Sequence, residues 1–333
     1  MEYIPPKERF NHHASSKKIP NEILEPALLK FGFKPALSTI QRLSGGFMNA
    51  NFLVECDGKK VVLRIYSTDS ATAQREFDLL RYLETRSLQV PKALRIFEIQ
   101  DRPIVFLEFL EGCTLEDKLL SAGKSATDLQ IFEDLGSQLG RIHAIRFQST
   151  GFIGPQLAIG NEYEDFSVFI REFIERSLVV LEGQTDRLDL STNQRLRQLV
   201  KDQWPMVLAT EPVRQLVHTD FNPKNILVSR DFPSKLLGVI DWEFALSGNG
   251  LCDLGNFFRF SYDYPEGAKQ HFMAAYRSSN PQWPGIQAQN WEAVSKLLDL
   301  GNICSFLIRE ENYPKTFRSA RAVIAETLKY FAY

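Results

Sequence analysis

The sequence predicts an α+β protein of two lobes, in which an antiparallel sheet with one helix precedes a larger, mainly α-helical region. Three patterns predict this class. Apolar and polar residues alternate from about residue 38 to residue 109, where Asp57-Gly58 marks a hairpin turn. From about residue 111 the apolar residues follow helical spacing, and one short β island at residues 215–240 interrupts them.

The predicted strands of the first lobe are Phe47–Glu55, Lys60–Tyr66, Leu94–Ile99 and Ile104–Phe109. Alternation in the second of these strands places Arg64 on the face opposite its most apolar row. Polar residues at 67–70 then cap a helix of about sixteen residues, whose buried stripe includes Glu76.

The change of spacing at Glu111-Gly112 sets the predicted domain boundary. We expect an N-terminal arm and first helix over residues 1–36, an N-lobe over residues 37–110 and a C-lobe over residues 111–333. The predicted helices of the C-lobe are 128–144, 164–182, 192–209, 251–279 and 286–331.

Composition and charge limit the function. The chain has 333 residues, of which 44% are hydrophobic and 24% charged, so it can bury a core, and its length suits two domains. The 39 basic and 41 acidic side chains leave a net charge of −2, which excludes a strongly basic nucleic-acid-binding protein. We therefore expect no nucleic-acid partner.

The sequence predicts a cytoplasmic protein without a membrane partner. Its four cysteines lie far apart and form no CxxC pair, which is typical of a reducing compartment. The N-terminal residues show no basic start followed by an apolar run, and the chain has no uninterrupted stretch of roughly 18 apolar residues. We interpret His12-His13, which lies in a polar segment, as part of a solvated arm rather than a metal site.

The β island carries the chemistry. Its strands Ile226–Val228 and Leu236–Ile240 suit an antiparallel hairpin, so Asn225 and Asp241 at its open end are expected to lie side by side. A carbonyl oxygen and a carboxylate are hard ligands of the kind that Mg²⁺ takes. Asp220, in the same loop as Asn225, is a further carboxylate that does not need to hold metal. A base beside a Mg²⁺ site is the arrangement that phosphoryl transfer requires.

Two strings, LVHTDFNPKNILV and GVIDWEFALSGNGLCDLGNFF, resemble those of the aminoglycoside phosphotransferase and choline kinase superfamily of protein-kinase-like enzymes. The resemblance runs from about Leu43 to Phe258. It implies a bilobal protein-kinase-like fold with the short β-hairpin at the catalytic site of the C-lobe. It also implies that Asp220 is the catalytic base and that Asn225 and Asp241 bind Mg²⁺.

The same resemblance gives neighbouring residues supporting roles. His218 is expected to order the catalytic loop and Asp253 to anchor it by hydrogen bonds, whereas His143 is interpreted as a core or capping residue. Glu243, two residues after Asp241, could touch metal, contact substrate or face solvent, and the sequence leaves these three roles open.

The N-lobe supplies the expected nucleotide site. Ser44, Gly45 and Gly46 resemble the family's phosphate-covering hairpin, in which glycines let backbone N–H groups approach the nucleotide. Arg64 stands where protein kinases carry the phosphate-binding lysine, and Glu76 matches the ion-pair partner of that lysine. An arginine can bind phosphate oxygens in a bidentate manner.

Glu108 and Leu110 lie in a stretch that resembles the hinge whose backbone groups receive adenine. The resemblance implies ATP and Mg²⁺ as cofactors, with GTP left open. Asn222 in place of the lysine of protein kinases, and Trp242-Glu243 in place of Phe-Gly, argue against a protein kinase. We therefore expect a small-molecule acceptor.

The expected activity is transfer of the γ-phosphate to a hydroxyl of a small molecule, such as an aminoglycoside, a choline-like compound, homoserine or a sugar. Acidic candidates for an acceptor site, each with a solvated surface as its alternative, are Glu162, Glu164, Asp165, Asp263, Glu310 and Glu311. Aromatic candidates for binding a cationic head group, with core packing as the alternative, are Trp283, Trp291, Tyr262 and Tyr264. A catalytically silent kinase-like nucleotide-binding module is the alternative function, and the oligomeric state is left open.

Overall fold

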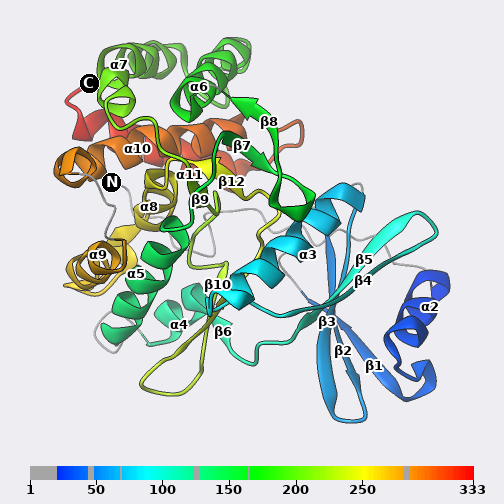
Figure 1. The fold of residues 1–333 in the computed structure, drawn as a ribbon. Coiled ribbons are helices and arrows are strands. Elements are labelled where there is room, and N and C mark those ends of the chain that lie inside the picture. The colour runs from blue at the N-terminus through cyan, green and yellow to red at the C-terminus, as the bar shows by residue number, and fades with distance from the viewer. Residues whose placement is uncertain (1–20, 44–48, 68–69, 123–127, 164, 281–284) are drawn as a thin grey trace.

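The computed structural model describes residues 21–43, 49–67, 70–122, 128–163, 165–280 and 285–333 (Figure 1). Several predictions lie outside the described residues: those for His12-His13, for Ser44, Gly45 and Gly46, for Glu164 and for Trp283. The side chain of Glu162 is likewise outside them. Among the described residues, none of the helices combines the length and the hydrophobicity that a membrane-spanning helix needs.

A five-stranded antiparallel sheet forms the N-terminal part, with strand order β1-β2-β3-β5-β4 (Figure 1). The Asp57-Gly58 turn joins β2 to β3 with positive φ at both residues, 49° and 74°, as a two-residue hairpin turn requires. The strands are β1 (Ser38–Arg42), β2 (Ala50–Cys56), β3 (Lys59–Ile65), β4 (Ala93–Ile99) and β5 (Arg102–Glu108).

Two helices, α2 (Asn21–Phe31) and α3 (Ser70–Thr85), cover opposite faces of this sheet (Figure 1). Apolar residues of β3 pack in one cluster with α2, whereas Tyr66 packs in the other cluster with the leucines of α3. Arg64 and Glu76 are buried on the α3 side, at 5% and 1% exposure. The predicted alternation of β3 and the predicted stripe of α3 are therefore confirmed.

Most of the predicted helices of the C-terminal part are present, but two predicted spans are wrong. Pro265 and Gly267, which has a φ of 84°, divide the span 251–279 into two helices. Pro314 begins a new helix within the span 286–331, because a proline suits the first turn of a helix and not its interior. The helices are α4 (Leu115–Ala122), α5 (Gln130–His143), α6 (Phe166–Glu182), α7 (Leu190–Leu208), α8 (Leu251–Phe258), α9 (Ala268–Ser279), α10 (Gly285–Leu307) and α11 (Pro314–Tyr330).

Short strands build two small sheets beside the helices. The predicted hairpin is confirmed as β10 (Ile226–Val228) paired antiparallel with β11 (Leu236–Val239), and β6 (Cys113–Thr114) adds to its other edge. A four-stranded sheet has the order β8-β7-β12-β9. Of its strands only β9 (Gln215–Val217) was predicted, and the others are β7 (Thr150–Ile153), β8 (Ile159–Tyr163) and β12 (Leu246–Gly248).

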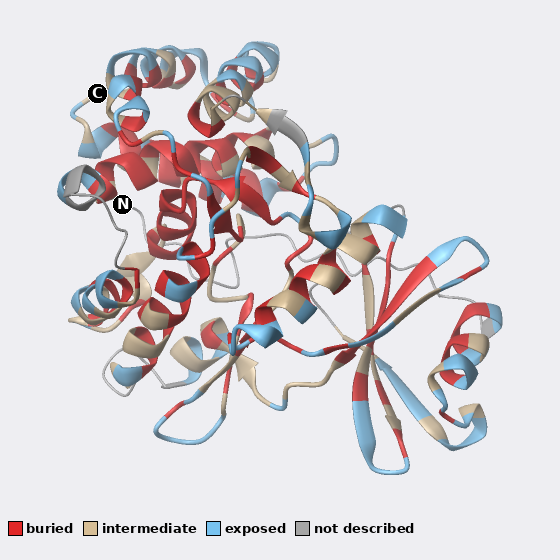
Figure 2. Ribbon diagram, in the orientation of Figure 1, coloured by how far each residue is buried: buried red, intermediate tan, exposed pale blue. Residues whose placement is uncertain are grey.

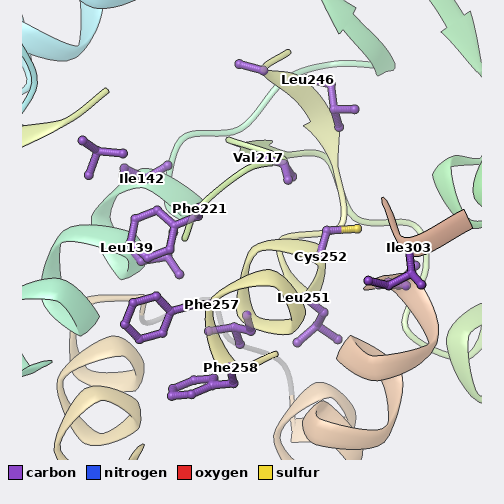
Figure 3. Close-up of a cluster of buried hydrophobic side chains, with 14 of the residues drawn as sticks. Leu139, Ile142, Val217, Phe221, Leu246, Leu251, Cys252, Phe257, Phe258 and Ile303 are labelled. Atoms are coloured by element: carbon purple, nitrogen blue, oxygen red, sulfur yellow. The ribbon is translucent and has the colours of Figure 1, made fainter. Parts of the chain in front are cut away.

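The main core lies beneath the loop that follows β9. All eight residues of α8 are buried, and Figure 2 shows α8 and much of α10 in the colour of buried residues. Val217 and Phe221, both 0% exposed, flank the loop residues 218–220. Figure 3 shows their side chains within the cluster that Leu139 and Ile142 of α5 form with α8. Apolar anchors thus hold both ends of the short loop that carries Asp220.

Candidate active site

The hairpin β10–β11 brings the predicted metal ligands to one end. The backbone N–H of Ile240 donates to the carbonyl of Asn225 at 2.9 Å, so Asn225 faces Ile240 and Asp241 follows directly. The pairing is one residue out of the predicted register, because β11 ends at Val239. Asp241 has a φ of 71°, a left-handed conformation that turns the chain out of the strand.

Asp220 is held by two amide side chains. Asn225 Nδ2 donates to Asp220 Oδ2 and Asn222 Nδ2 donates to Asp220 Oδ1, each at 2.7 Å. Burial raises the pKa of the Asp220 carboxyl, and the negative charge of Asp241 adds to that rise. The structure therefore brings the predicted base and the two predicted metal ligands together.

Asp253 anchors the loop that carries Asp220. It is fully buried and accepts hydrogen bonds from the backbone N–H groups of His218 and Thr219, each at 2.8 Å. Its Oδ2 also lies 3.1 Å from Nε2 of His143, which is itself fully buried. Thr219 has a φ of 72°, a strained conformation for a β-branched residue, and the charge-assisted hydrogen bonds to Asp253 stabilise it.

His218 joins this loop to the hairpin. Its Nε2 lies 2.9 Å from the carbonyl oxygen of Ile240, so Nε2 must donate, and its Nδ1 accepts from the backbone N–H of Asp220 at 3.2 Å. These bonds fit the neutral tautomer with its proton on Nε2. His218 therefore fixes the spacing between Asp220 and the residue before Asp241.

Arg64 contacts three carboxylates. Its Nη1 donates to Glu76 at 3.2 Å, and its Nη2 lies 2.7 Å from Asp241 and 3.3 Å from Glu243. Tyr66 donates to the second carboxylate oxygen of Glu76 at 2.5 Å. Burial disfavours the charge of Arg64, yet the attraction of Glu76 and the other carboxylates raises its pKa well above the ordinary value. The predicted Arg64–Glu76 pair is thus present and lies against Asp241.

Glu243 is a site residue whose role the sequence left open. It is 6% exposed, so the solvent-facing role is wrong. Its carboxylate accepts a hydrogen bond from Asn49 Nδ2, and its backbone carbonyl accepts one from Arg75 Nη2 at 2.6 Å. Burial raises the pKa of Glu243 to about 7, and Asp241 contributes to the rise. No local pattern could have indicated Asn49 and Arg75, which lie 194 and 168 residues away in the chain.

The donor set fits a divalent cation beside a phosphate chain. One guanidinium, that of Arg64, faces three carboxylates, and the excess negative charge suits Mg²⁺. Asn225 commits its amide nitrogen to Asp220, which leaves its side-chain carbonyl oxygen available as a hard ligand. Arg64 Nε is buried without a hydrogen-bond partner among the described residues, and it is a donor that a phosphate oxygen can accept from.

The predicted hinge leads from the N-terminal sheet to β6, which pairs with β10 of the hairpin. A Cβ on Gly112 would lie 2.3 Å from the carbonyl oxygen of Val228, so only glycine fits where the chain enters β6 beside β10. Leu110 packs against Gly238, where a Cβ would lie 2.6 Å from Leu110 Cδ1. The adenine-binding roles of Glu108 and Leu110, and the domain boundary at residue 110, stay predictions.

Among the candidate acceptor residues that the structure describes, two rings are packed, Asp165, Tyr262 and Asp263 are half-buried, and others are exposed. Asp165 caps α6, because its Oδ1 accepts a backbone N–H at 2.9 Å. Tyr264 and Trp291 are 7% and 9% exposed and pack against other aromatic rings of the core. Glu310 and Glu311 are exposed. The packing alternative therefore holds for the two rings, and Asp165 is engaged in a helix cap.

Known proteins resemble this chain in sequence. A model of the phosphotransferase enzyme family matches residues 39–289. Acyl-CoA dehydrogenase family member 11 of Pongo abelii is 22% identical over 291 residues, which are 84% of this chain and 35% of that protein. The protein of the same name from Homo sapiens is 23% identical over the same shares of both chains. This chain therefore spans about a third of the length of these curated relatives.

Solved structures share the fold. A thermostable mutant of aminoglycoside phosphotransferase APH(4)-Ia, in ternary complex with AMP-PNP and hygromycin B, matches with a TM-score of 0.65 at 21% identity, covering 92% of this chain and 96% of that one. The ethanolamine kinase of Plasmodium vivax matches with a TM-score of 0.58 at 15% identity, covering 92% and 86%. The predicted α+β fold, with its N-terminal antiparallel sheet and helical C-terminal part, is confirmed.

Proposed function

We propose, because the chain belongs to the phosphotransferase enzyme family, that it transfers the γ-phosphate of ATP to a hydroxyl group of a small molecule. In this proposal Asp220 orients the acceptor hydroxyl and accepts its proton, while Arg64, steadied by Glu76, binds the α- and β-phosphates. Asn225 and Asp241 would hold Mg²⁺, which when bound supplies positive charge to the phosphate oxygens. Positioning and electrostatics then account for most of the rate.

The observation that carries this proposal is the 2.7 Å hydrogen bond from Asn225 to Asp220. It makes the proposed base a neighbour of a proposed metal ligand, while Arg64 reaches Asp241 from β3, also at 2.7 Å. The proposed base and the proposed metal ligand Asn225 lie in the loop before β10, and the proposed ligand Asp241 and the proposed phosphate-binding Arg64 meet them from beyond β11 and from β3. ATP is the nucleotide we propose, since a structural relative was crystallised with AMP-PNP, and GTP is a parallel arm of the test.

The alternative is a catalytically silent module that binds nucleotide. Such modules lose the base or a metal ligand, whereas this chain keeps Asp220, Asn225 and Asp241. The enzyme is therefore the function that we favour. The two functions differ in one measurable outcome, because only the enzyme forms a phosphorylated acceptor.

A transfer assay with γ-³²P-labelled ATP or GTP and Mg²⁺ tests the proposal. The acceptor panel holds aminoglycosides, choline and ethanolamine, homoserine, sugars and hydroxylated acyl-CoA thioesters. The last class is included because the matched curated relatives are named acyl-CoA dehydrogenases. A labelled product with one acceptor class supports the enzyme. No labelled product from any class, with ATP still stabilising the chain against heat, would favour the silent module.

A further inference from the structure

The dipeptide Trp242-Glu243 connects the catalytic hairpin to elements of the N-terminal sheet and α3. The backbone N–H of Trp242 donates to Glu76 at 3.3 Å, and Arg75 donates to the backbone carbonyl of Glu243 at 2.6 Å. The Glu243 carboxylate adds contacts to Asn49 and, at 3.3 Å, to Arg64. All four partners come from residues 49–76, so this dipeptide joins two regions that are distant in the chain.

Burial separates Glu243 from its neighbour Asp241. The Asp241 side chain is 33% exposed, whereas the Glu243 side chain is 8% exposed and shares its Oε2 between Asn49 and Arg64. A magnesium ion usually keeps several waters and phosphate oxygens, so the more exposed carboxylate is the one suited to ligate it. The Glu243 carboxylate is instead committed to side chains of the N-terminal sheet.

We propose that Glu243 is a positioning residue, which fixes Arg64 and Asn49 for binding the nucleotide phosphates and does not ligate Mg²⁺. The inference rests on the proposed function. Asn49 also connects to the end of β3, because its Oδ1 accepts a hydrogen bond from the backbone N–H of Ser67, just beyond that strand. One carboxylate therefore orients both the phosphate-binding arginine and Asn49, the residue that precedes β2.

The test uses the full chain with Glu243→Gln, Asn49→Ala and the double variant. Glu211→Gln is the matched control, since Glu211 is a half-buried glutamate whose partners, Val213 and Asn249, lie outside the site. Heat stabilisation is measured twice, first against ATP at saturating Mg²⁺ and then against Mg²⁺ at saturating ATP. A positioning role predicts that each single variant raises the half-saturating ATP concentration about tenfold. It also predicts that the double variant binds ATP no more weakly than the single variant with the lower ATP affinity. The half-saturating Mg²⁺ concentration should change by less than about twofold.

Two results would overturn the inference. A tenfold rise in half-saturating Mg²⁺ for Glu243→Gln, with Asn49→Ala unchanged, would make Glu243 a metal ligand. Fully additive effects on ATP binding would show that the two side chains act independently. Failure of the wild-type chain to bind either ATP or GTP with Mg²⁺ would refute the proposed function instead. The coupling between Glu243 and Asn49 is then measured by urea unfolding of the wild type, the two single variants and the double variant. A coupling that changes the unfolding constant by less than about twofold would contradict the inference.

Discussion

Asn225 donates its side-chain N–H to Asp220 at 2.7 Å, so the proposed base and one proposed metal ligand form a single hydrogen-bonded unit. His218 strengthens this unit, because it bonds to the backbone N–H of Asp220 and to the carbonyl of Ile240. The loop and the hairpin therefore cannot shift independently. A change at a metal ligand is expected to alter the geometry of the base as well.

The first prediction concerns the proposed metal ligand Asp241. Replacement by asparagine removes a charged oxygen ligand, so the Mg²⁺ concentration needed for half of the ATP-dependent heat stabilisation should rise at least about tenfold. Asp231→Asn is the matched control, since Asp231 is an exposed carboxylate in the turn at the other end of the same hairpin. An excess of EDTA should abolish the stabilisation of the wild-type chain by ATP. Stabilisation that persists in EDTA would speak against a metal-dependent site.

The second prediction concerns the anchor Asp253. In Asp253→Asn an amide N–H would face one of the buried donors on His218, Thr219 or His143. We expect a loss of about 2–4 kcal/mol in the free energy of unfolding by urea. Asp186→Asn, on the exposed surface, should change it by less than about 0.5 kcal/mol. Equal effects of the two variants would contradict the anchoring role.

The third prediction concerns pH. Burial raises the pKa of Glu211 from 4.5 to about 7, so the folded chain binds this proton more tightly than the unfolded chain. The resulting stabilisation is complete below about pH 4.5 and is lost as the pH rises through about 7. Between pH 5 and pH 8 the wild type should therefore lose about 1–3 kcal/mol that Glu211→Gln does not lose. Glu175→Gln, at an exposed position of α6, should keep the wild-type pH dependence in urea unfolding.

The fourth prediction concerns the contact between α5 and α9. A Cβ on Gly136 would lie 2.1 Å from the backbone carbonyl oxygen of Phe272, so Gly136→Ala must push the two helices apart. We expect a loss of about 2–3 kcal/mol in the free energy of unfolding. Gly183→Ala is the control, because the nearest atom to its Cβ, the carbonyl oxygen of Val180, is 3.8 Å away. A Gly136→Ala variant as stable as Gly183→Ala would contradict this packing.

Much of the site could be predicted because its signals are local. Asn225 and Asp241 flank the two strands of one hairpin at its open end, and strand alternation separates Arg64 from the most apolar row of β3. The role of Glu243 could not be predicted, since its partner Asn49 is 194 residues away. Which distant side chains meet depends on how the sheet packs against the hairpin. The spacing of residues in the sequence does not indicate this packing.

The errors in the fold have similar physical causes. The strands β7, β8 and β12 have only three to five residues, too few for an alternating pattern to stand out. The two predicted spans that each joined two helices are different, because the sequence contains residues that mark the break within each span. Pro265 with Gly267, and Pro314, are residues that interrupt helices. Each span was predicted as one helix because apolar residues follow helical spacing on both sides of its break.

Comparing transfer with nucleotide binding in Asp220→Asn tests the central claim most directly. Asparagine keeps the size of the side chain, and its amide oxygen can still accept the hydrogen bond from Asn225, but it cannot accept the hydroxyl proton. Asp220 itself makes no direct contact with Arg64. With the acceptor found in the screen, ³²P transfer should fall at least about a hundredfold, while ATP with Mg²⁺ stabilises the variant as it does the wild type. Transfer at the wild-type rate, or loss of ATP binding together with transfer, would contradict the assignment of Asp220 as the base.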